Sequence, residues 1–287
     1  MVRKTLIIIL FAILFASCRS VDLSGFLTSP SETVDARFEQ SLALTKGESV
    51  ERLETDESYT FYVCTDTHVD GSTRNLGRFV EDMRSDIDAV FGVCLGDCID
   101  SKGMMKTYAD AISYKNGTHK SDSPMFSLIG NHDLFFSQWN DFKKYIGPSV
   151  YYFELASQGA RDLYVVLDSA NGSHGIRQIS WLKELFKLHR GEYRHCVVMT
   201  HVNIFKTDNS QNTSGNLPLE ETYMLTDLFD QYDVSLVLQG HDHYREDLIY
   251  RDVRYTIVGT IKDSAREPEY LKVRVEGSGL AFEWVYL

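Results

Sequence analysis

Six short apolar runs lie between residues 59 and 240, and many of their residues are β-branched or aromatic. Runs of this length and composition are typical of strands buried on both faces of a sheet. They cover residues 59–64, 89–95, 124–129, 163–167, 196–199 and 234–239. Amphipathic segments between several of the runs predict helices over residues 76–84, 104–114, 175–189 and 219–232. Strands that alternate with helices indicate an α/β fold.

Potential metal ligands follow five of these six runs, while the sixth run, 163–167, ends in Asp168. Ligands of open α/β sheets bind at the carboxyl ends of the strands, so we expect these side chains to gather at one edge. One histidine at a strand end is more often structural, but five strand ends of this kind favour a functional site. The candidate ligands are Asp66, His68, Asp97, Asn131, His201, His241 and His243.

The donor atoms of this set are imidazole nitrogens and carboxylate or amide oxygens, with no thiolate. Such donors suit Zn, Fe, Mn or similar ions. Seven ligands are more than one ion can use, whereas two ions that share one carboxylate would employ all of them. Two ions about 3.5–4 Å apart form the clamp used for in-line phosphoryl displacement. The pattern therefore predicts a two-metal site that attracts phosphate.

Composition and charge restrict the possible partners. Of the 287 residues, 43% are hydrophobic and 24% are charged, as in ordinary globular proteins. The formal net charge is −12, whereas proteins that bind nucleic-acid phosphates are normally basic. We therefore expect no nucleic-acid partner. An anionic substrate would be attracted by the bound metal ions instead.

The first 17 residues have the layout of a secretory signal, because two basic residues precede a nearly continuous apolar run over residues 5–16. That run is too short for an ordinary membrane-spanning helix. Small residues stand just before Cys18 and resemble a bacterial lipobox, although Phe15 departs from the usual leucine. We therefore expect an exported lipoprotein, anchored through Cys18 and facing the periplasm or the cell exterior. An ordinary cleaved signal and an uncleaved anchor remain alternatives.

The rest of the chain divides into an N-terminal extension and one domain. Residues 18–58 are polar and acidic, with a possible short helix over 32–44, and are interpreted as a spacer from the anchor plus an element that packs on the domain. Residues 59–287 form that domain. Four further cysteines lie outside any CxxC pattern and are expected to be small buried residues, with one disulfide left open. They are Cys64, Cys94, Cys98 and Cys196.

Five motifs in this order, DTH, GDCID, GNHD, TH and GHDH, resemble those of the calcineurin-like metallophosphoesterase family. The resemblance covers roughly residues 59–260 and implies a four-layer sandwich of two mixed β-sheets flanked by helices. It also implies two divalent or mixed-valence ions of Mn, Fe or Zn. One departure is Asn203, which stands where the family usually has proline after the lone histidine.

The resemblance also implies a role for each candidate residue. Asp66, His68 and His243 would hold one metal ion, and Asn131, His201 and His241 the other. Asp97 would bridge the two ions, and a bridging hydroxide would attack phosphorus. His132 would bind the phosphate or protonate the leaving oxygen, as a positioned imidazole can.

Several further residues have weaker signals. Asp133 would orient His132 or a metal ligand, or cap the following helix, and Asp100 would support the site or only its own loop. Arg74, the aromatic segment 134–139 and the long loop 203–216 are candidates for substrate contact, although structural roles are favoured for each. The remaining candidates are expected to be solvated, on the surface or on a helix: Asp242, His119, His174, His189 and His195.

The leading functional hypothesis is a two-metal hydrolase of phosphoric esters, either a phosphomonoesterase or a phosphodiesterase. A small or lipid-derived phosphoester suits an exported enzyme. The alternatives are a nuclease, which the net charge disfavours, and a lipid-anchored binding protein that retains metals without hydrolysis.

Overall fold

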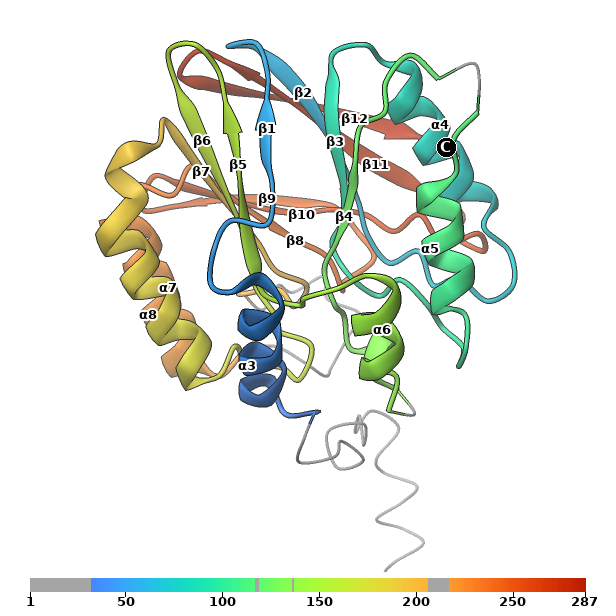
Figure 1. The fold of residues 1–287 in the computed structure, drawn as a ribbon, viewed down its shortest axis with the longest axis horizontal. Helices are drawn as coiled ribbons and strands as arrows, with labels where there is room; N and C mark the ends of the chain where they lie inside the picture. The colour runs from blue at the N-terminus through green and yellow to red at the C-terminus, as the bar shows by residue number, and fades with distance from the viewer. Residues whose placement is uncertain (1–31, 117–118, 136, 206–216) are drawn as a thin grey trace, which may run out of the picture.

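The computed structural model describes residues 32–116, 119–135, 137–205 and 217–287, so Cys18 and the predicted signal lie outside it (Figure 1). Two mixed sheets lie face to face between helices, which confirms the predicted α/β sandwich. In spatial order the larger sheet contains β1 (Arg52–Glu54), β5 (Tyr151–Ala156), β6 (Arg161–Val166), β7 (His195–Met199), β8 (Leu236–Gln239), β10 (Val253–Ile257) and β9 (Glu246–Tyr250). The smaller sheet contains β12 (Gly279–Tyr286), β11 (Glu269–Glu276), β2 (Tyr59–Cys64), β3 (Ala89–Cys94) and β4 (Met125–Ser127).

Helices cover the outer face of each sheet. The smaller sheet packs against α4 (Arg74–Ser85), α5 (Met105–Ser113) and α6 (Trp139–Tyr145). The larger sheet packs against α7 (Ile176–His189) and α8 (Leu219–Gln231), and α3 (Val34–Thr45) lies beside α7 and β5. The described residues also form two short 3-10 helices, η2 (His132–Leu134) and η3 (Arg190–Glu192). Within the described residues, no helix is long and apolar enough to span a membrane.

The alternation of side chains along each strand fills two kinds of core. Phe61 and Val63 of β2 point into the layer between the sheets, whereas Tyr62 and Cys64 point toward the helices. Between the sheets, the ring of Phe61 stacks on that of Phe91 with 4.9 Å between centroids. Each such fully buried side chain contributes roughly 1.5–3 kcal/mol by leaving water. Both faces of the strands are therefore apolar, as the short continuous runs predicted.

All six predicted strands and all four predicted helices are present, with ends shifted by a few residues. The possible helix over 32–44 is confirmed as α3. The apolar runs did not reveal β1, β5, β9, β10, β11 or β12. Of these strands, β9 and β12 expose much of their length at the edges of their sheets. A continuous apolar run indicates a strand that is buried on both faces. An edge strand with one solvated face lacks such a run and is therefore not predicted by it.

The described residues before the first predicted strand, 32–58, pack with the larger sheet. β1 pairs in parallel with β5. Arg37 of α3 is fully buried and binds both oxygens of Asp168, at 2.7 Å each. Asp168, the residue after the sixth apolar run, is therefore occupied by an ion pair with the N-terminal helix.

Candidate metal centre

The parallel strands of both sheets end at one edge of the sandwich, and the motif residues gather there. β2 is followed by Asp66 and His68, and β3 by Asp97. Asn131 and His132 follow β4, His201 follows β7, and His241 and His243 follow β8. Segments that are distant in sequence thus meet at one place because their strands are parallel neighbours.

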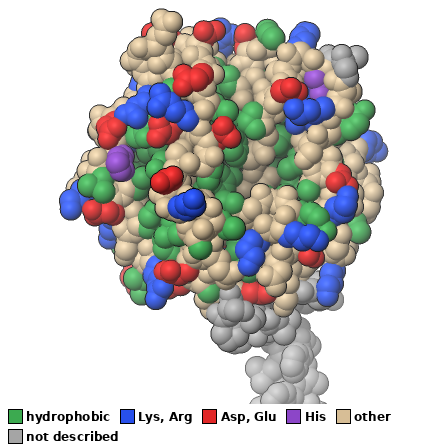
Figure 2. All heavy atoms as spheres, viewed as in Figure 1, with side chains coloured by type: hydrophobic (Ala, Val, Ile, Leu, Met, Phe, Trp, Pro, Cys, Tyr) green, Lys and Arg blue, Asp and Glu red, His purple; other side chains and the backbone are tan. Residues whose placement is uncertain are grey.

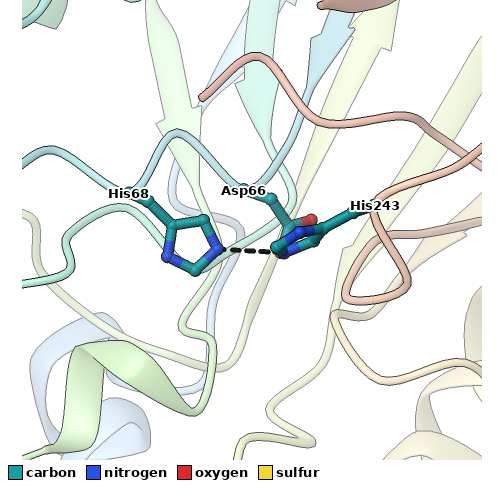
Figure 3. Close-up of side chains that lie close together, drawn as sticks. All are labelled: Asp66, His68 and His243. Atoms are coloured by element: carbon teal, nitrogen blue, oxygen red, sulfur yellow. Dashed lines mark hydrogen bonds and ion pairs between the residues drawn. The ribbon is translucent and has the colours of Figure 1, made fainter. Parts of the chain in front are cut away.

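Asp66, His68 and His243 form the first group of candidate ligands (Figure 3). The Nε2 atoms of the two imidazoles lie 3.0 Å apart. Asp66 Oδ1 lies 3.1 Å from His243 Nε2 and 3.6 Å from His68 Nε2. This oxygen is buried and accepts no hydrogen bond, while Oδ2 accepts from the backbone N–H of His241 at 2.9 Å. A buried carboxylate oxygen without a donor is costly unless a cation binds it.

Asp97, His201 and His241 form the second group, with Asn131 beside them. His201 Nε2 is 3.3 Å from Asp97 Oδ1, 3.3 Å from Asn131 Oδ1 and 3.3 Å from His241 Nδ1. The other nitrogen of His201, Nδ1, lies 2.8 Å from the Leu95 carbonyl oxygen. That contact turns Nε2 toward the shared centre, as outer partners of metal-binding histidines commonly do.

Asp97, a member of the second group, also faces the first group. Its Oδ1 faces His201, and its Oδ2 lies 3.8 Å from His68 Nε2 of the first group. The donors are imidazoles, carboxylates and an amide, and one oxygen is orphaned, so these residues fit the metal ions that the sequence predicts.

His132 lies at the rim of this centre with 29% of its side chain exposed. Its Nε2 is 4.0 Å from Asp97 Oδ2, and its Nδ1 is 2.9 Å from Asp100 Oδ1. The same oxygen of Asp100 is 3.4 Å from His68 Nδ1. Burial lowers the pKa of the His132 imidazole, with the nearby Asp97 charge acting in the opposite direction. The contacts and the exposed fraction together place the His132 ring between the candidate ligands and solvent.

The backbone of the site is strained at the candidate ligands themselves. Asp66, His68, Asp97, His241 and His243 all have positive φ, between 44° and 74°. Residues with a Cβ rarely adopt this conformation, and such strain clusters at functional sites. Two motif glycines explain how the loops approach so closely. A Cβ on Gly96 would lie 2.7 Å from His201 Nδ1, and one on Gly130 would lie 2.2 Å from Asp97 Oδ1.

The candidate ligands shift one another's pKa values in opposite directions for acids and bases. Burial alone would lower the pKa of the His68 imidazole, but Asp100 and Asp66 outweigh burial and raise that pKa to about 10. Burial of His201 is likewise outweighed, mainly by Asp97, and the pKa of His201 rises to about 10. In turn the His201 charge holds the pKa of the buried Asp97 carboxyl well below its usual range. Protons on the imidazoles thus occupy the place that metal cations would take.

Two acidic residues near the ligands connect the motif loops. Asp133 is fully buried and accepts from the backbone N–H groups of Gly130 at 2.9 Å and Ile99 at 3.1 Å. It thus holds the GNHD loop against the GDCID loop, and burial raises its pKa to about 7.

The prediction that Asp242 is solvated is wrong, because Asp242 is buried and accepts a hydrogen bond from Asn203 Nδ2 at 2.9 Å. Asn203, the departure from the family pattern, thereby joins the His201 loop to the GHDH loop.

The prediction of four peripheral histidines is wrong for three of them. His174 Nδ1 lies 2.6 Å from Glu221 Oε1, and its Nε2 lies 3.0 Å from Thr200 Oγ1. His195 is buried in β7, and the side chain of His119 is buried against Glu81. A histidine in a polar segment gives no sequence signal of a distant buried partner. His189, at the end of α7, is exposed as predicted.

The candidates for substrate contact separate in the structure. Arg74 donates from Nη2 to the carbonyl of Asp263 at 2.8 Å, which makes it part of the α4 N-terminus. Phe135 lies beside His132 with 4.5 Å between ring centroids, whereas Trp139 is in the core. The segment 206–216 and Phe136 lie outside the described residues. The four cysteines in the described residues are all buried, as expected, and they form no disulfide with one another.

The family model of calcineurin-like phosphoesterases matches residues 59–245, which include all five motifs. The match spans more than half of the chain, and the chain belongs to this family. It is a phosphoric ester hydrolase of the metallophosphoesterase type, with His and Asp groups that could hold metal ions. No curated protein matches the chain at a significant level.

Solved structures of low sequence identity share the fold. GAP50, the anchor in the inner membrane complex of Plasmodium, has a TM-score of 0.63 at 15% identity, over 80% of this chain and 84% of that one. A dimetal phosphatase from Danio rerio has a TM-score of 0.58 at 13% identity, over 79% and 95% of the two chains. A purple acid phosphatase from yellow lupin has a TM-score of 0.61 at 14% identity, over 84% of this chain and 52% of that enzyme.

Proposed function

We propose that this chain hydrolyses phosphoric esters with two metal ions that share Asp97. One observation carries the proposal: the two oxygens of Asp97 face different groups of candidate ligands, Oδ1 toward His201 at 3.3 Å and Oδ2 toward His68 at 3.8 Å. Such a pair of bound ions supplies an activated hydroxide nucleophile and stabilises charge on the phosphoryl oxygens.

The residues of the chain orient the reacting groups. His201 is held by the Leu95 carbonyl, and Asp66 by the backbone N–H of His241, so both enter the site with fixed geometry. His132 stands at the solvent side of the cluster, where a leaving group departs. We assign it the general acid: Nε2–H gives its proton to the leaving oxygen, which takes the electron pair of the breaking P–O bond.

The substrate in this proposal is a small or lipid-derived phosphoester. On the face drawn in Figure 2, Lys and Arg side chains are interspersed with Asp and Glu, without a stripe of one sign. Together with the net charge of −12, this favours a substrate recognised at the metal centre over a long polyanion. Monoesters and diesters both suit such a centre.

The general-acid role is tested with His132→Ala. The variant should keep its metal ions and lose turnover by about 10²–10⁴-fold on an alkyl phosphoester, whose leaving alkoxide needs a proton. The loss should be much smaller on nitrophenyl phosphate, since nitrophenolate leaves without protonation. His189→Ala, an exposed histidine at the end of α7, is the matched control and should behave as wild type.

Other outcomes would contradict the proposal in distinct ways. Loss of metal in His132→Ala would make His132 a ligand, and an equal loss on both substrates would make it a phosphate-binding residue. A protein that binds metal but hydrolyses neither substrate would be a metal-retaining binding protein. Hydrolysis of polynucleotides orders of magnitude faster than small esters would indicate a nuclease.

We also propose that the protein is exported and anchored to a membrane through a lipid on Cys18. The support is the sequence: a short apolar run is preceded by two basic residues and followed by small residues before Cys18. Cys18→Ser should leave the protein unprocessed or release it from the membrane fraction. A variant that is still processed and lipid-labelled would contradict the assignment.

A further inference from the structure

We propose that Lys262 is a positioning residue for His132 and acts through the carboxylate of Asp100. This inference rests on the proposed function, in which His132 is the general acid. Lys262 lies outside residues 59–245, which the family model matches, and belongs to none of the five motifs. Its ammonium Nζ lies 3.0 Å from Asp100 Oδ2.

Asp100 connects the ammonium to the imidazole. Its Oδ1 lies 2.9 Å from His132 Nδ1, while its Oδ2 contacts Lys262 Nζ. About a third of the Asp100 side chain is exposed (30%), so the carboxylate has room to turn toward water. A partner bound to Oδ2 opposes that rotation and keeps Oδ1 on His132. The imidazole then presents Nε2 to the leaving oxygen in one orientation.

The segment that carries Lys262 is fixed to the metal centre. Thr260 Oγ1 donates to the carbonyl oxygen of Asp66 at 2.7 Å and accepts from the backbone N–H of Lys262 at 3.0 Å. The carbonyl of Lys262 accepts from Asn75 Nδ2 of α4 at 3.2 Å. The backbone at Lys262 is therefore linked by hydrogen bonds both to the Asp66 loop, through Thr260, and to α4, through Asn75. A flexible surface lysine would lack this support.

Lys262 also differs from the other cations in its partner. Among the ion pairs of the described residues, Lys262–Asp100 is the one that joins a Lys or Arg to a carboxylate of the five motifs. The other pairs, such as Lys106–Asp110, lie on the surface or in structural clusters. Lys262, between β10 and β11, thus supplies the site with an ammonium group that the motifs do not contain.

The test compares three variants of the full chain. Lys262→Met removes the ammonium and keeps most of the stem, Lys262→Arg restores a cation, and Lys106→Met is a matched control from an exposed pair. Turnover of an alkyl phosphoester should fall about 10–100-fold in Lys262→Met and less than about threefold on nitrophenyl phosphate, the range typical of an outer partner. Metal content and the unfolding midpoint should stay at wild-type values. Lys262→Arg should recover most of the lost turnover.

A second readout follows the imidazole itself. A proton on His132 Nδ1, which lies 2.9 Å from Asp100 Oδ1, should give a downfield proton resonance that is absent in His132→Ala. In Lys262→Met this resonance should shift or broaden because the carboxylate is no longer held. It should be unchanged in Lys106→Met.

Three outcomes would overturn the inference. An equal loss on both substrates with a raised KM would make Lys262 a phosphate-binding residue. Loss of metal or a lower unfolding midpoint would make it structural, and unchanged turnover with an unchanged resonance would leave it no role. If wild-type protein hydrolysed neither substrate, the proposed function would fail, and the His132 resonance would still report whether Lys262 positions the ring.

Discussion

Asp66 and Asp168 each follow a buried strand at the same edge of the sandwich, and both side chains are inaccessible to water. Their surroundings differ. Both oxygens of Asp168 are bound by the guanidinium of Arg37, and Oδ1 also accepts from the backbone N–H of Ala170. Asp66 has one oxygen without a hydrogen-bond donor, a backbone φ of 52°, and two imidazoles facing it.

The difference separates a structural carboxylate from one prepared for a ligand. A buried carboxylate whose partners are complete gains nothing from a further cation. One with an orphaned oxygen on a strained backbone is retained at a cost to the metal-free protein. The Arg37–Asp168 pair should therefore govern stability, and the Asp66 and Asp97 cluster should govern metal binding and activity.

Arg37→Met should have the largest effect, which is a fall in the free energy of unfolding. It would leave the fully buried Asp168 carboxylate without its cation, a change that costs about 3–5 kcal/mol in comparable cases. Denaturant and thermal unfolding would measure the loss. Arg177→Met, which breaks an exposed pair with Glu39, is the control and should change little. A loss as small as the control's would mean that Asp168 needs no cation.

Asp97→Asn should affect metal binding and turnover rather than stability. Removing one negative charge between the two ligand groups should lower metal content and reduce turnover by about 10²–10³-fold. Metal analysis and nitrophenyl phosphate hydrolysis would measure both, with Asp110→Asn on the exposed face of α5 as control. Wild-type metal content in Asp97→Asn would show that this carboxylate does not join the two ions.

Metal affinity should rise with pH. The metal-free imidazoles of His68 and His201 have pKa values raised to about 10, so both carry a proton at pH 7 that metal binding must displace. Each displaced proton makes affinity about tenfold stronger per pH unit below that pKa. Calorimetry in buffers of different ionisation enthalpy should find about two protons released per chain. Affinity that is constant between pH 6.5 and 8.5 would exclude this exchange.

The smallest expected effect isolates backbone strain at a candidate ligand. His243 has a φ of 61°, so metal-free His243→Gly should be more stable than metal-free His243→Ala by about 1 kcal/mol. Urea unfolding would measure the difference. At Lys187, exposed within α7, the same pair of substitutions should give the opposite order, because glycine weakens a helix by about 1 kcal/mol relative to alanine. Equal stability of the two His243 variants would mean that the site carries no strain there.

The apolar runs and the motifs after them were readable from the chain because both are local patterns. A doubly buried strand requires a continuous apolar run, as in β2 and β3, and the candidate ligands stand within a few residues of its end. Parallel strands then bring those ends together wherever they lie in the sequence. The α/β class, the four central helices and the positions of the candidate ligands could therefore be predicted from the sequence alone.

Tertiary structure decided which polar residues found partners far away in the chain. The sequence around Asp168 does not show that Arg37 binds it, since this partner is 131 residues away. The same holds for His174 against Glu221, Asn203 against Asp242, and Lys262 against Asp100. A charged or polar side chain shows its role only through what it contacts. The sequence determines which groups need a partner, and the packing of distant segments determines which partner each receives.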